Sequence, residues 1–233
     1  STVINALIGK DILPEHNKAL TAIPTYIRKG ESKPVVHYLS PEERVELYNL
    51  WVREIEHKLL LKNAPYLDAQ EDPKIKFAEL KRMVQDIHDP ENTLKNELQQ
   101  MGKLVGKWGE KYQAHTIGQE ELTNYVTVKN PDIILISRVE VFVPDIDLPD
   151  DMVLVDLPGL NVANPLHKKI TRDFVEGQAN SFVICMKPDH LLEGEEINLL
   201  QEVYQKIPGI LEGAFWVFNK WELADEQQRR QGE

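Results

Sequence analysis

Three short apolar runs in the C-terminal half constrain the fold most strongly. They are Met152–Val155, Phe182–Met186 and Ala214–Phe218. Such near-continuous hydrophobic runs are typical of strands covered on both faces. Helical stretches lie between them, at about His167–Gln178 and Glu195–Lys206. This strand–helix alternation predicts an α/β fold with a mostly parallel sheet and helices on both faces.

The N-terminal segment is expected to contribute further elements to this sheet. The pattern predicts a helix over Ser1–Ile8, which Gly9 can end in a left-handed conformation. Strands are predicted at Thr25–Arg28 and Pro34–Tyr38, with Gly30 turning between them. Two more strands are predicted later in the chain, at Ile133–Ile136 and Val139–Val143.

A helical segment separates these parts of the sheet. Ser40-Pro41-Glu42-Glu43 is a strong helix start, because it offers a capping hydroxyl, an initial proline and carboxylates at the positive end of the dipole. Apolar residues follow at spacings of three and four, which indicates one buried stripe: Leu47, Leu50, Trp51, Ile55 and Leu59. Further helices are predicted at Lys74–Ile87, Asn92–Gln113 and Gln119–Tyr125.

Composition limits the classes of partner. The chain has 233 residues and a formal net charge of −11, so its surface as a whole should repel nucleic acid and anionic lipid. Its one cysteine, Cys185, lies in an apolar run and is expected to be a buried small hydrophobe. One thiol forms no internal disulfide, and no apolar stretch reaches the ~20 residues that span a bilayer. These features favour a cytoplasmic protein.

Asp156-Leu157-Pro158-Gly159 is the first candidate for chemistry, because it directly follows an apolar strand. Ligands of open parallel sheets bind beyond the carboxyl ends of strands. An aspartate there can hold Mg²⁺ directly or through a water. Gly159 can present its backbone N–H closely to a phosphate, since no side chain obstructs it.

Asn219-Lys220-Trp221-Glu222 follows the strand Ala214–Phe218. The pattern Asn-Lys-x-Asp at a strand end is the guanine-reading element of GTPases. Its carboxylate accepts hydrogen bonds from the base, and its lysine stem covers the ring. Here the acid is Glu222, which is one methylene longer, so a different base and a solvated turn remain as alternatives.

The run Ser1-Thr2-Val3-Ile4-Asn5-Ala6-Leu7-Ile8-Gly9-Lys10-Asp11-Ile12-Leu13-Pro14 resembles the dynamin family, especially bacterial dynamin-like proteins. In that family a phosphate-binding Gly-Lys-Ser is followed by a helix, a glycine and a Leu-Pro. Thr21-Ala22-Ile23-Pro24-Thr25 resembles the first switch of the family. Asp156–Gly159 matches its second switch, and Asn219–Glu222 matches its base-reading element with the glutamate as an exception.

The resemblance implies a role for each matched residue. Ser1 and Thr21 would bind Mg²⁺, and Thr21 would also orient the attacking water, with Thr25 as the reserve candidate. Asp156 would act on the metal through a water, and Gly159 would donate its N–H to the γ-phosphate. Asn219, Lys220 and Glu222 would bind the guanine base of GTP or GDP.

The resemblance also implies an architecture. Residues 1–39 and 130–233 would form a GTPase domain of the P-loop type, and residues 40–129 a helical insertion between the two switches. The first strand and most of the P-loop would precede Ser1, so this chain alone is expected to bind GTP weakly and to be inactive. The family hydrolyses GTP, pairs across the nucleotide as a homodimer or oligomer, and remodels membranes through other regions. Asp189 and Glu196 are candidates for contacts with the partner.

Two other classes of protein remain as alternatives. A GTPase of the translation-factor type shares Asp-x-Pro-Gly and Asn-Lys-x-Asp, but the acidic charge and the long helical segment argue against it. A degenerate scaffold with a GTPase fold that never hydrolyses nucleotide is the second alternative, and Glu222 leaves it open.

Overall fold

The computed structural model describes residues 2–14, 23–89, 93–126, 132–158, 165–177, 179–186, 194–206 and 209–218. The chain divides into two compact units, Ser1–His167 and Lys168–Glu233. The described residues form a mixed α/β fold with seven α-helices. No helix among them is long and apolar enough to cross a bilayer.

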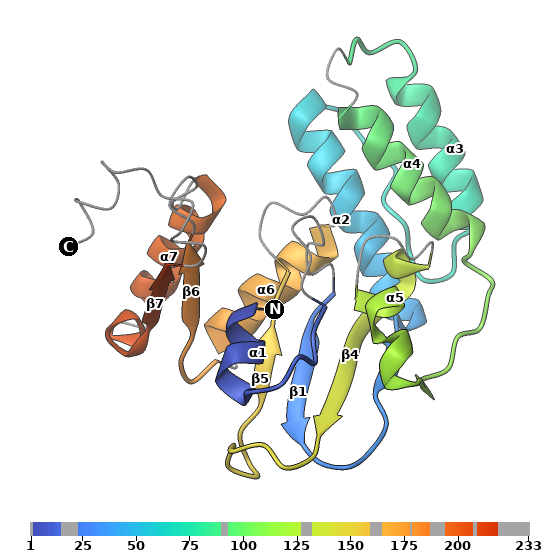
Figure 1. Cartoon of the computed structure of the whole chain (residues 1–233). Coiled ribbons are helices and arrows are strands. Elements are labelled where there is room, and N and C mark those ends of the chain that lie inside the picture. Colours follow the sequence, from blue (N-terminus) through green and yellow to red (C-terminus); the bar gives the residue numbers. More distant parts are fainter. Residues whose placement is uncertain are drawn as a thin grey trace. The chain divides into compact units, whose positions relative to one another are not determined.

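Unit 1 is built on a five-stranded sheet in the order β3-β2-β4-β1-β5, of which Figure 1 labels β4, β1 and β5. The strands are β1 (Thr25–Lys29), β2 (Val35–Tyr38), β3 (His115–Thr116), β4 (Ile136–Val143) and β5 (Leu154–Asp156). β1 and β4 are parallel, whereas the other three neighbouring pairs are antiparallel.

The sheet of unit 1 is therefore mixed, and the prediction of a mostly parallel sheet was wrong for it. The connections explain why. Only residues 30–34 join β1 to β2, and only residues 144–153 join β4 to β5. A parallel crossover needs a dozen or more residues, so both connections reverse the chain. β4 then inserts between β1 and β2, and β1 lies between β4 and β5.

The two strands predicted around residue 137 are one strand preceded by a tight turn. Ile133–Leu135 forms a 3₁₀ turn, η2, in which the Leu135 N–H donates to the Asp132 carbonyl at 2.8 Å. The Leu39 N–H donates to the Leu135 carbonyl at 2.7 Å, which ties this turn to the end of β2. β4 begins only after the turn, at Ile136.

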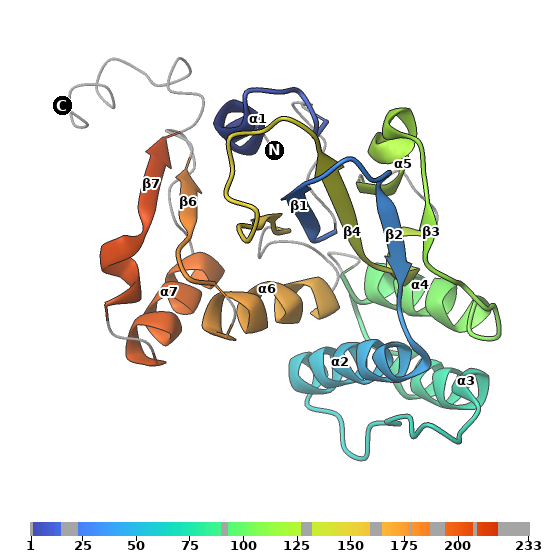
Figure 2. The same cartoon turned by 90° about the horizontal axis from the view of Figure 1, so that it is seen from below.

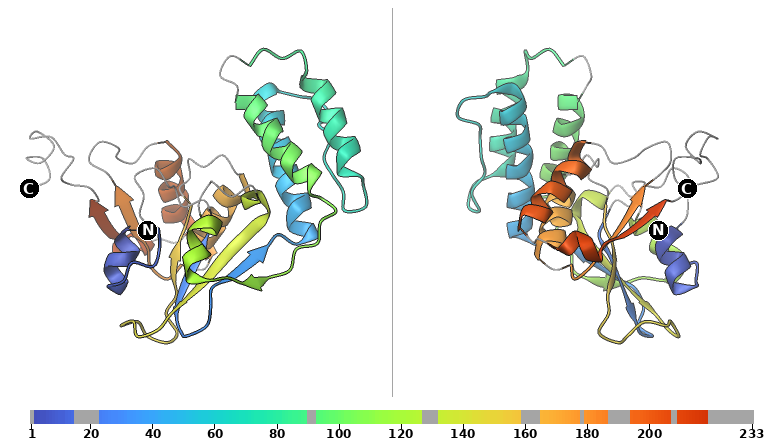
Figure 3. Two further views of the ribbon diagram at one scale, coloured as in Figure 1. Left: turned by 45° about the vertical axis from the view of Figure 1, so that its right-hand side comes forward. Right: turned by 90° about the vertical axis from the view of Figure 1, so that its left-hand side faces the viewer.

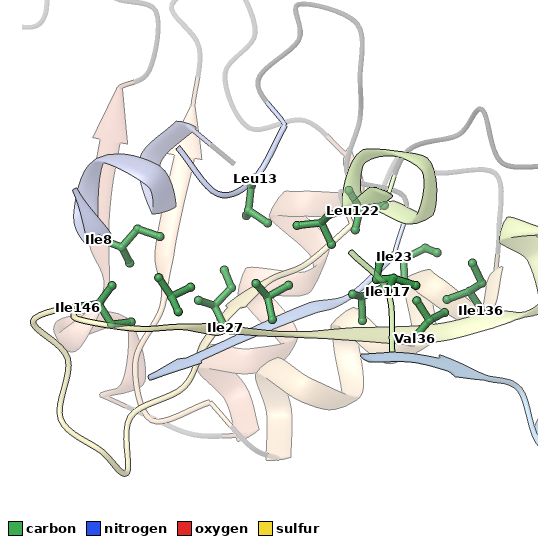
Figure 4. Close-up of a cluster of buried hydrophobic side chains, with 13 residues drawn as sticks. Ile8, Leu13, Ile23, Ile27, Val36, Ile117, Leu122, Ile136 and Ile146 are labelled. Carbon is green, nitrogen blue, oxygen red and sulfur yellow. The ribbon is translucent and has the colours of Figure 1, made fainter. Parts of the chain in front are cut away.

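The hydrophobic core of the sheet lies on one face, as Figure 4 shows. Along β4 the valines at 139, 141 and 143 are buried, whereas Arg138, Glu140 and Phe142 are partly exposed. Side chains alternate between the faces of a strand, so the opposite face is largely polar. On the apolar face lie Ile8 of α1 (Thr2–Ile8), and Leu122 and Val126 of α5 (Leu122–Val126), which follows the turn η1 (Gln119–Glu121). Helices over the second face stay a prediction.

Three long helices extend from the sheet (Figure 3): α2 (Pro41–Leu59), α3 (Pro73–Val84) and α4 (Thr93–Gly106). α4 contacts both of the others. The predicted capping box is present, since the Ser40 hydroxyl accepts from the Glu43 N–H at 3.1 Å and the Glu43 carboxylate accepts from the Ser40 N–H at 2.7 Å. Such a cap stabilises a helix by about 1 kcal/mol. The core between the helices is apolar: Leu47, Tyr48, Trp51, Val52, Ile55, Leu67, Leu80, Met101 and Leu104.

Arg44, which is 6% exposed, ties the start of α2 to the residue after β2 and to the turn after α4. Its Nη1 donates to the carbonyls of Trp108 and Glu110, both at 2.9 Å, and its Nε donates to the Leu39 carbonyl at 3.3 Å. The guanidinium also lies 5.7 Å from the centre of the Tyr112 ring. That ring stacks on Tyr38, the last residue of β2, with 4.6 Å between ring centres.

After α4 the chain returns to the sheet before residue 129. β3 pairs with β2, and three residues that follow it lie in the core of the sheet: Ile117, Leu122 and Val126. The helical part proper thus spans α2 to α4. The domain boundaries at 39 and 130 stay a proposal.

Unit 2 shows the predicted strand–helix–strand alternation (Figure 2). It contains most of α6 (Pro165–Gly177), then β6 (Val183–Met186), α7 (Gly194–Lys206), the turn η3 (Ile210–Gly213) and β7 (Phe215–Phe218). β6 and β7 are parallel neighbours, with Val183 opposite Phe215 and Met186 opposite Phe218. Two ion pairs join α6 to α7: Arg172–Glu202 at 3.4 Å and Glu176–Lys206 at 2.6 Å.

The strands of unit 2 are more exposed than their sequences predict. Val183 is 41% and Phe215 66% exposed, and Cys185 is exposed as well. The register places these three on the same face of the pair. The prediction that Cys185 is buried was wrong, because no described element of unit 2 covers that face of the strand pair.

Candidate functional site

Asp156 is the last residue of β5 and is half-buried. In the antiparallel register of β1 and β5 it lies directly opposite Thr25, and Leu154 lies opposite Ile27. Directly opposed residues project from the same face, as do residues two apart on a strand. Ile27 is fully buried in the core. Asp156 and Thr25 therefore lie on the face of the sheet that carries the core and α1.

The chain after Asp156 leaves the sheet through Leu157 and Pro158, and Pro158 is buried. The aspartate thus stands at a strand end, as predicted. Gly159, expected to donate its N–H to a phosphate, lies outside the described residues.

Thr25 is 1% exposed, and its hydroxyl donates to the Ile23 carbonyl at 3.2 Å. The neighbouring Pro24 carbonyl accepts from the Val139 N–H of β4 at 3.0 Å. These bonds fix the segment that directly follows Thr21. Because the Thr25 hydroxyl donates to the backbone carbonyl of Ile23, Thr25 suits a structural role better than that of a metal ligand. Thr21 itself lies outside the described residues.

The segment before the first switch is fixed as well. α1 ends at Gly9, which has a φ of +66°, the left-handed conformation that the sequence predicts. The chain then folds back along the helix, and Lys10 donates to the Pro144 carbonyl at 2.5 Å. Inside this fold the side chain of Asn5, 3% exposed, bonds to the backbone of Ile12 and Leu13. Ser1, expected at the metal, lies outside the described residues.

The residues predicted to bind the base, Asn219, Lys220 and Glu222, lie outside the described residues too. The strand predicted to precede them is present as β7, which ends at Phe218. Asp189 also lies outside the described part, and Glu196 lies in the first turn of α7.

Asp156 is the one predicted metal ligand that the described residues include. A carboxylate oxygen is a hard donor of the kind that Mg²⁺ prefers, so Asp156 fits the metal. The described residues contain no group of three or more His, Cys, Asp or Glu side chains that could hold a metal ion.

The residue that sequence reasoning missed is Asn5. Its signal was available, because Asn5 is the polar residue between Ile4 and Ile8 on the helix that those two residues pack into the core.

Comparison with solved structures shows the class of fold. The chain matches, over 99% of its length, a chain from the structure of an oligomerised bacterial dynamin pair, which is described as a mechanism for the long range sensing and tethering of membranes. The TM-score is 0.52 and the identity 15%, so the match shows the fold of a bacterial dynamin GTPase domain. The present chain spans 27% of that longer chain.

The chain belongs to the dynamin family, since the model of the Dynamin family matches residues 1–211. The matched region is the GTPase domain of this family, whose members are GTPases. A short stretch of 40 residues is 48% identical to the clamp-binding protein CrfC of Escherichia coli strain K12, and the same holds for CrfC of Escherichia coli. That alignment covers 16% of this chain and 5% of CrfC.

Proposed function

We propose that this chain is the GTP-binding and GTP-hydrolysing part of a dynamin-like protein that assembles with itself and remodels membranes. The observation that carries the proposal is the cross-strand placement of Asp156 opposite Thr25. It brings the second-switch aspartate beside the end of the segment that carries Thr21. The four matched elements also occur along the chain in the order that the resemblance implies, and the first three lie within residues 1–211, which the model of the Dynamin family matches.

In this proposal Ser1 and Thr21 supply hydroxyl ligands to Mg²⁺, and Asp156 holds the ion through a water. The metal would neutralise charge on the β- and γ-phosphates of GTP, which is most of what phosphoryl transfer to water requires. Thr21 orients the attacking water, and the Gly159 N–H donates to the γ-phosphate. Asn219, Lys220 and Glu222 hold the guanine base.

Self-association completes the proposal. Dimerisation across the nucleotide orders the catalytic water, and Asp189 and Glu196 are the residues proposed to contact the partner. The fold neighbour is an oligomerised pair described as tethering membranes. Membrane contact would come from regions other than this domain. The acidic surface argues against nucleic acid as a partner.

The test is GTP hydrolysis by the full-length protein over a range of protein concentrations, with Mg²⁺ and with excess EDTA. The proposal expects a rate per molecule that rises with protein concentration, that requires Mg²⁺ and that ATP does not reproduce. GTP binding without turnover at every concentration would instead identify a degenerate scaffold. Turnover that is independent of concentration would remove dimerisation from the mechanism.

A further inference from the structure

Asn5 is a polar side chain in a position that the core would otherwise fill with a hydrophobic one. It is 3% exposed, and Ile4 and Ile8 of the same helix pack into the hydrophobic core. Burial of an amide is unfavourable unless its hydrogen bonds are satisfied. Something other than hydrophobic packing must therefore favour asparagine here.

The side-chain amide of Asn5 forms hydrogen bonds with the backbone of Ile12 and Leu13, of the kind that the backbone of a neighbouring strand would form. Its Oδ1 accepts from the Leu13 N–H at 2.9 Å and from the Ile12 N–H at 3.2 Å. Its Nδ2 donates to the Leu13 carbonyl at 2.8 Å. One side chain thus satisfies both backbone groups of Leu13, whose own side chain is buried in the core.

These bonds join two segments that the proposed function needs in fixed relation. α1 follows Ser1, and the loop that ends in Leu13 and Pro14 leads into the segment that carries Thr21. Gly9 reverses the chain between them, and Lys10 anchors the same loop to the end of β4 through the Pro144 carbonyl. Asn5 is the residue of α1 whose side chain holds this loop against the helix.

We infer that Asn5 is a positioning residue for the proposed GTPase reaction. It holds the loop that ends in Leu13 against α1, and this loop leads into the first-switch segment of the proposed function. The inference rests on the proposed function and adds a residue that touches neither metal nor nucleotide.

Two variants of the full-length protein test it. Asn5→Ser removes all three bonds because serine is too short to reach Leu13. Asn5→Asp keeps the acceptor but replaces the donor to the Leu13 carbonyl by a carboxylate oxygen. Asn124→Asp, an exposed position on α5, is the matched control. GTP turnover is measured per folded molecule over a Mg²⁺ titration, and binding of a fluorescent GTP analogue is measured in EDTA.

Both variants should raise the Mg²⁺ concentration for half-maximal turnover by about tenfold, the order of effect expected when hydrogen bonds that hold the loop to α1 are lost. The Asn124→Asp control should match wild type. Metal-free nucleotide binding should change less than the Mg²⁺ dependence.

Unchanged Mg²⁺ dependence per folded molecule, with only a lower melting temperature, would overturn the inference and leave Asn5 with a purely structural role. A wild-type protein that hydrolyses no GTP would overturn the proposed function first. The two failures are thus distinguishable. Asn5→Ser introduces no charge, so it keeps the test open if Asn5→Asp does not fold.

Discussion

Thr25 and Asp156 lie directly opposite each other where β1 meets β5. Along the sequence they are separated by the whole helical segment and by β4, yet the antiparallel register makes them cross-strand neighbours. The strand end that carries the aspartate therefore cannot shift without disturbing the strand that continues the first-switch segment. If the proposed reaction moves either segment, the pairing of β1 with β5 would transmit the change to the other.

Asp156→Asn should lower GTP turnover by about 100-fold or more, because the neutral amide attracts a metal-bound water less strongly. The melting temperature should stay close to that of wild type. Phosphate release from GTP under saturating Mg²⁺ is the measurement. Asp147→Asn, in the exposed connection between β4 and β5, is the matched control and should retain full turnover.

Substitutions of Thr21 and Thr25 should have different effects on stability and on GTP turnover. Thr25→Val removes a hydroxyl that donates to the Ile23 carbonyl, so it should lower the free energy of unfolding by about 1 kcal/mol and leave turnover per folded molecule within a factor of about three. Thr21→Ala should abolish turnover without loss of stability. Chemical denaturation and phosphate release on the same preparations give both quantities, and the opposite pattern would make Thr25 the metal ligand.

Glu222→Asp should tighten GTP binding several-fold, since the shorter carboxylate restores the Asn-Lys-x-Asp pattern in which the acid meets the base in a fixed plane. Titration of the full-length protein with fluorescent GTP and ATP analogues measures the affinity and the selectivity together. Weaker GTP binding by the aspartate variant would show that this domain is adapted to the longer side chain.

Arg44→Ala should lower the free energy of unfolding by roughly 2–4 kcal/mol, because it leaves three backbone carbonyls without their donor and removes a buried side chain. Urea denaturation monitored by tryptophan fluorescence gives the value. Arg53→Ala, an exposed position on α2, should change it by no more than about 0.5 kcal/mol.

His37→Gln should reduce the loss of stability in mild acid. Burial and the neighbouring Arg138 lower the pKa of His37, and Glu140, whose carboxylate lies 3.5 Å from Nε2, opposes them only in part. The folded state therefore favours neutral imidazole, and the unfolded chain takes up the proton first as pH falls through its value of about 6.5. Stability held above that pH is lost as pH falls toward the folded pKa. Melting temperatures between about pH 7 and pH 5 measure the slope, with the exposed His57→Gln as control.

The sequence predicted the existence and type of most elements but not the way the sheet assembles. Apolar runs and the capping box at Ser40 depend on neighbours in sequence, so they are readable locally. The place of β4 between β1 and β2 depends on pairing with a strand about a hundred residues away. The direction of β5 could have been inferred, because the connection from β4 is too short for a parallel crossover.

The predictions for the candidate site differ in the same way, since some depend on local patterns and others on long-range pairing. That Asp156 ends a strand followed directly from the hydrophobic pattern, and the structure confirms it. That it faces Thr25 required the register, which no local pattern contains. The position of Asn5 between Ile4 and Ile8 indicated a buried polar side chain, but its partners at Ile12 and Leu13 come near it only after Gly9 reverses the chain.

The root of the three-helix segment has a mechanical consequence. The Arg44 guanidinium binds the residue that follows β2 and two residues that follow α4, and Tyr112 stacks on Tyr38 at the end of β2, so several contacts hold the root of the helices together. A force applied to the far end of the helices α2 to α4 would therefore be transmitted to β2 as a torque. Whatever presses on those helices would thus strain the sheet itself.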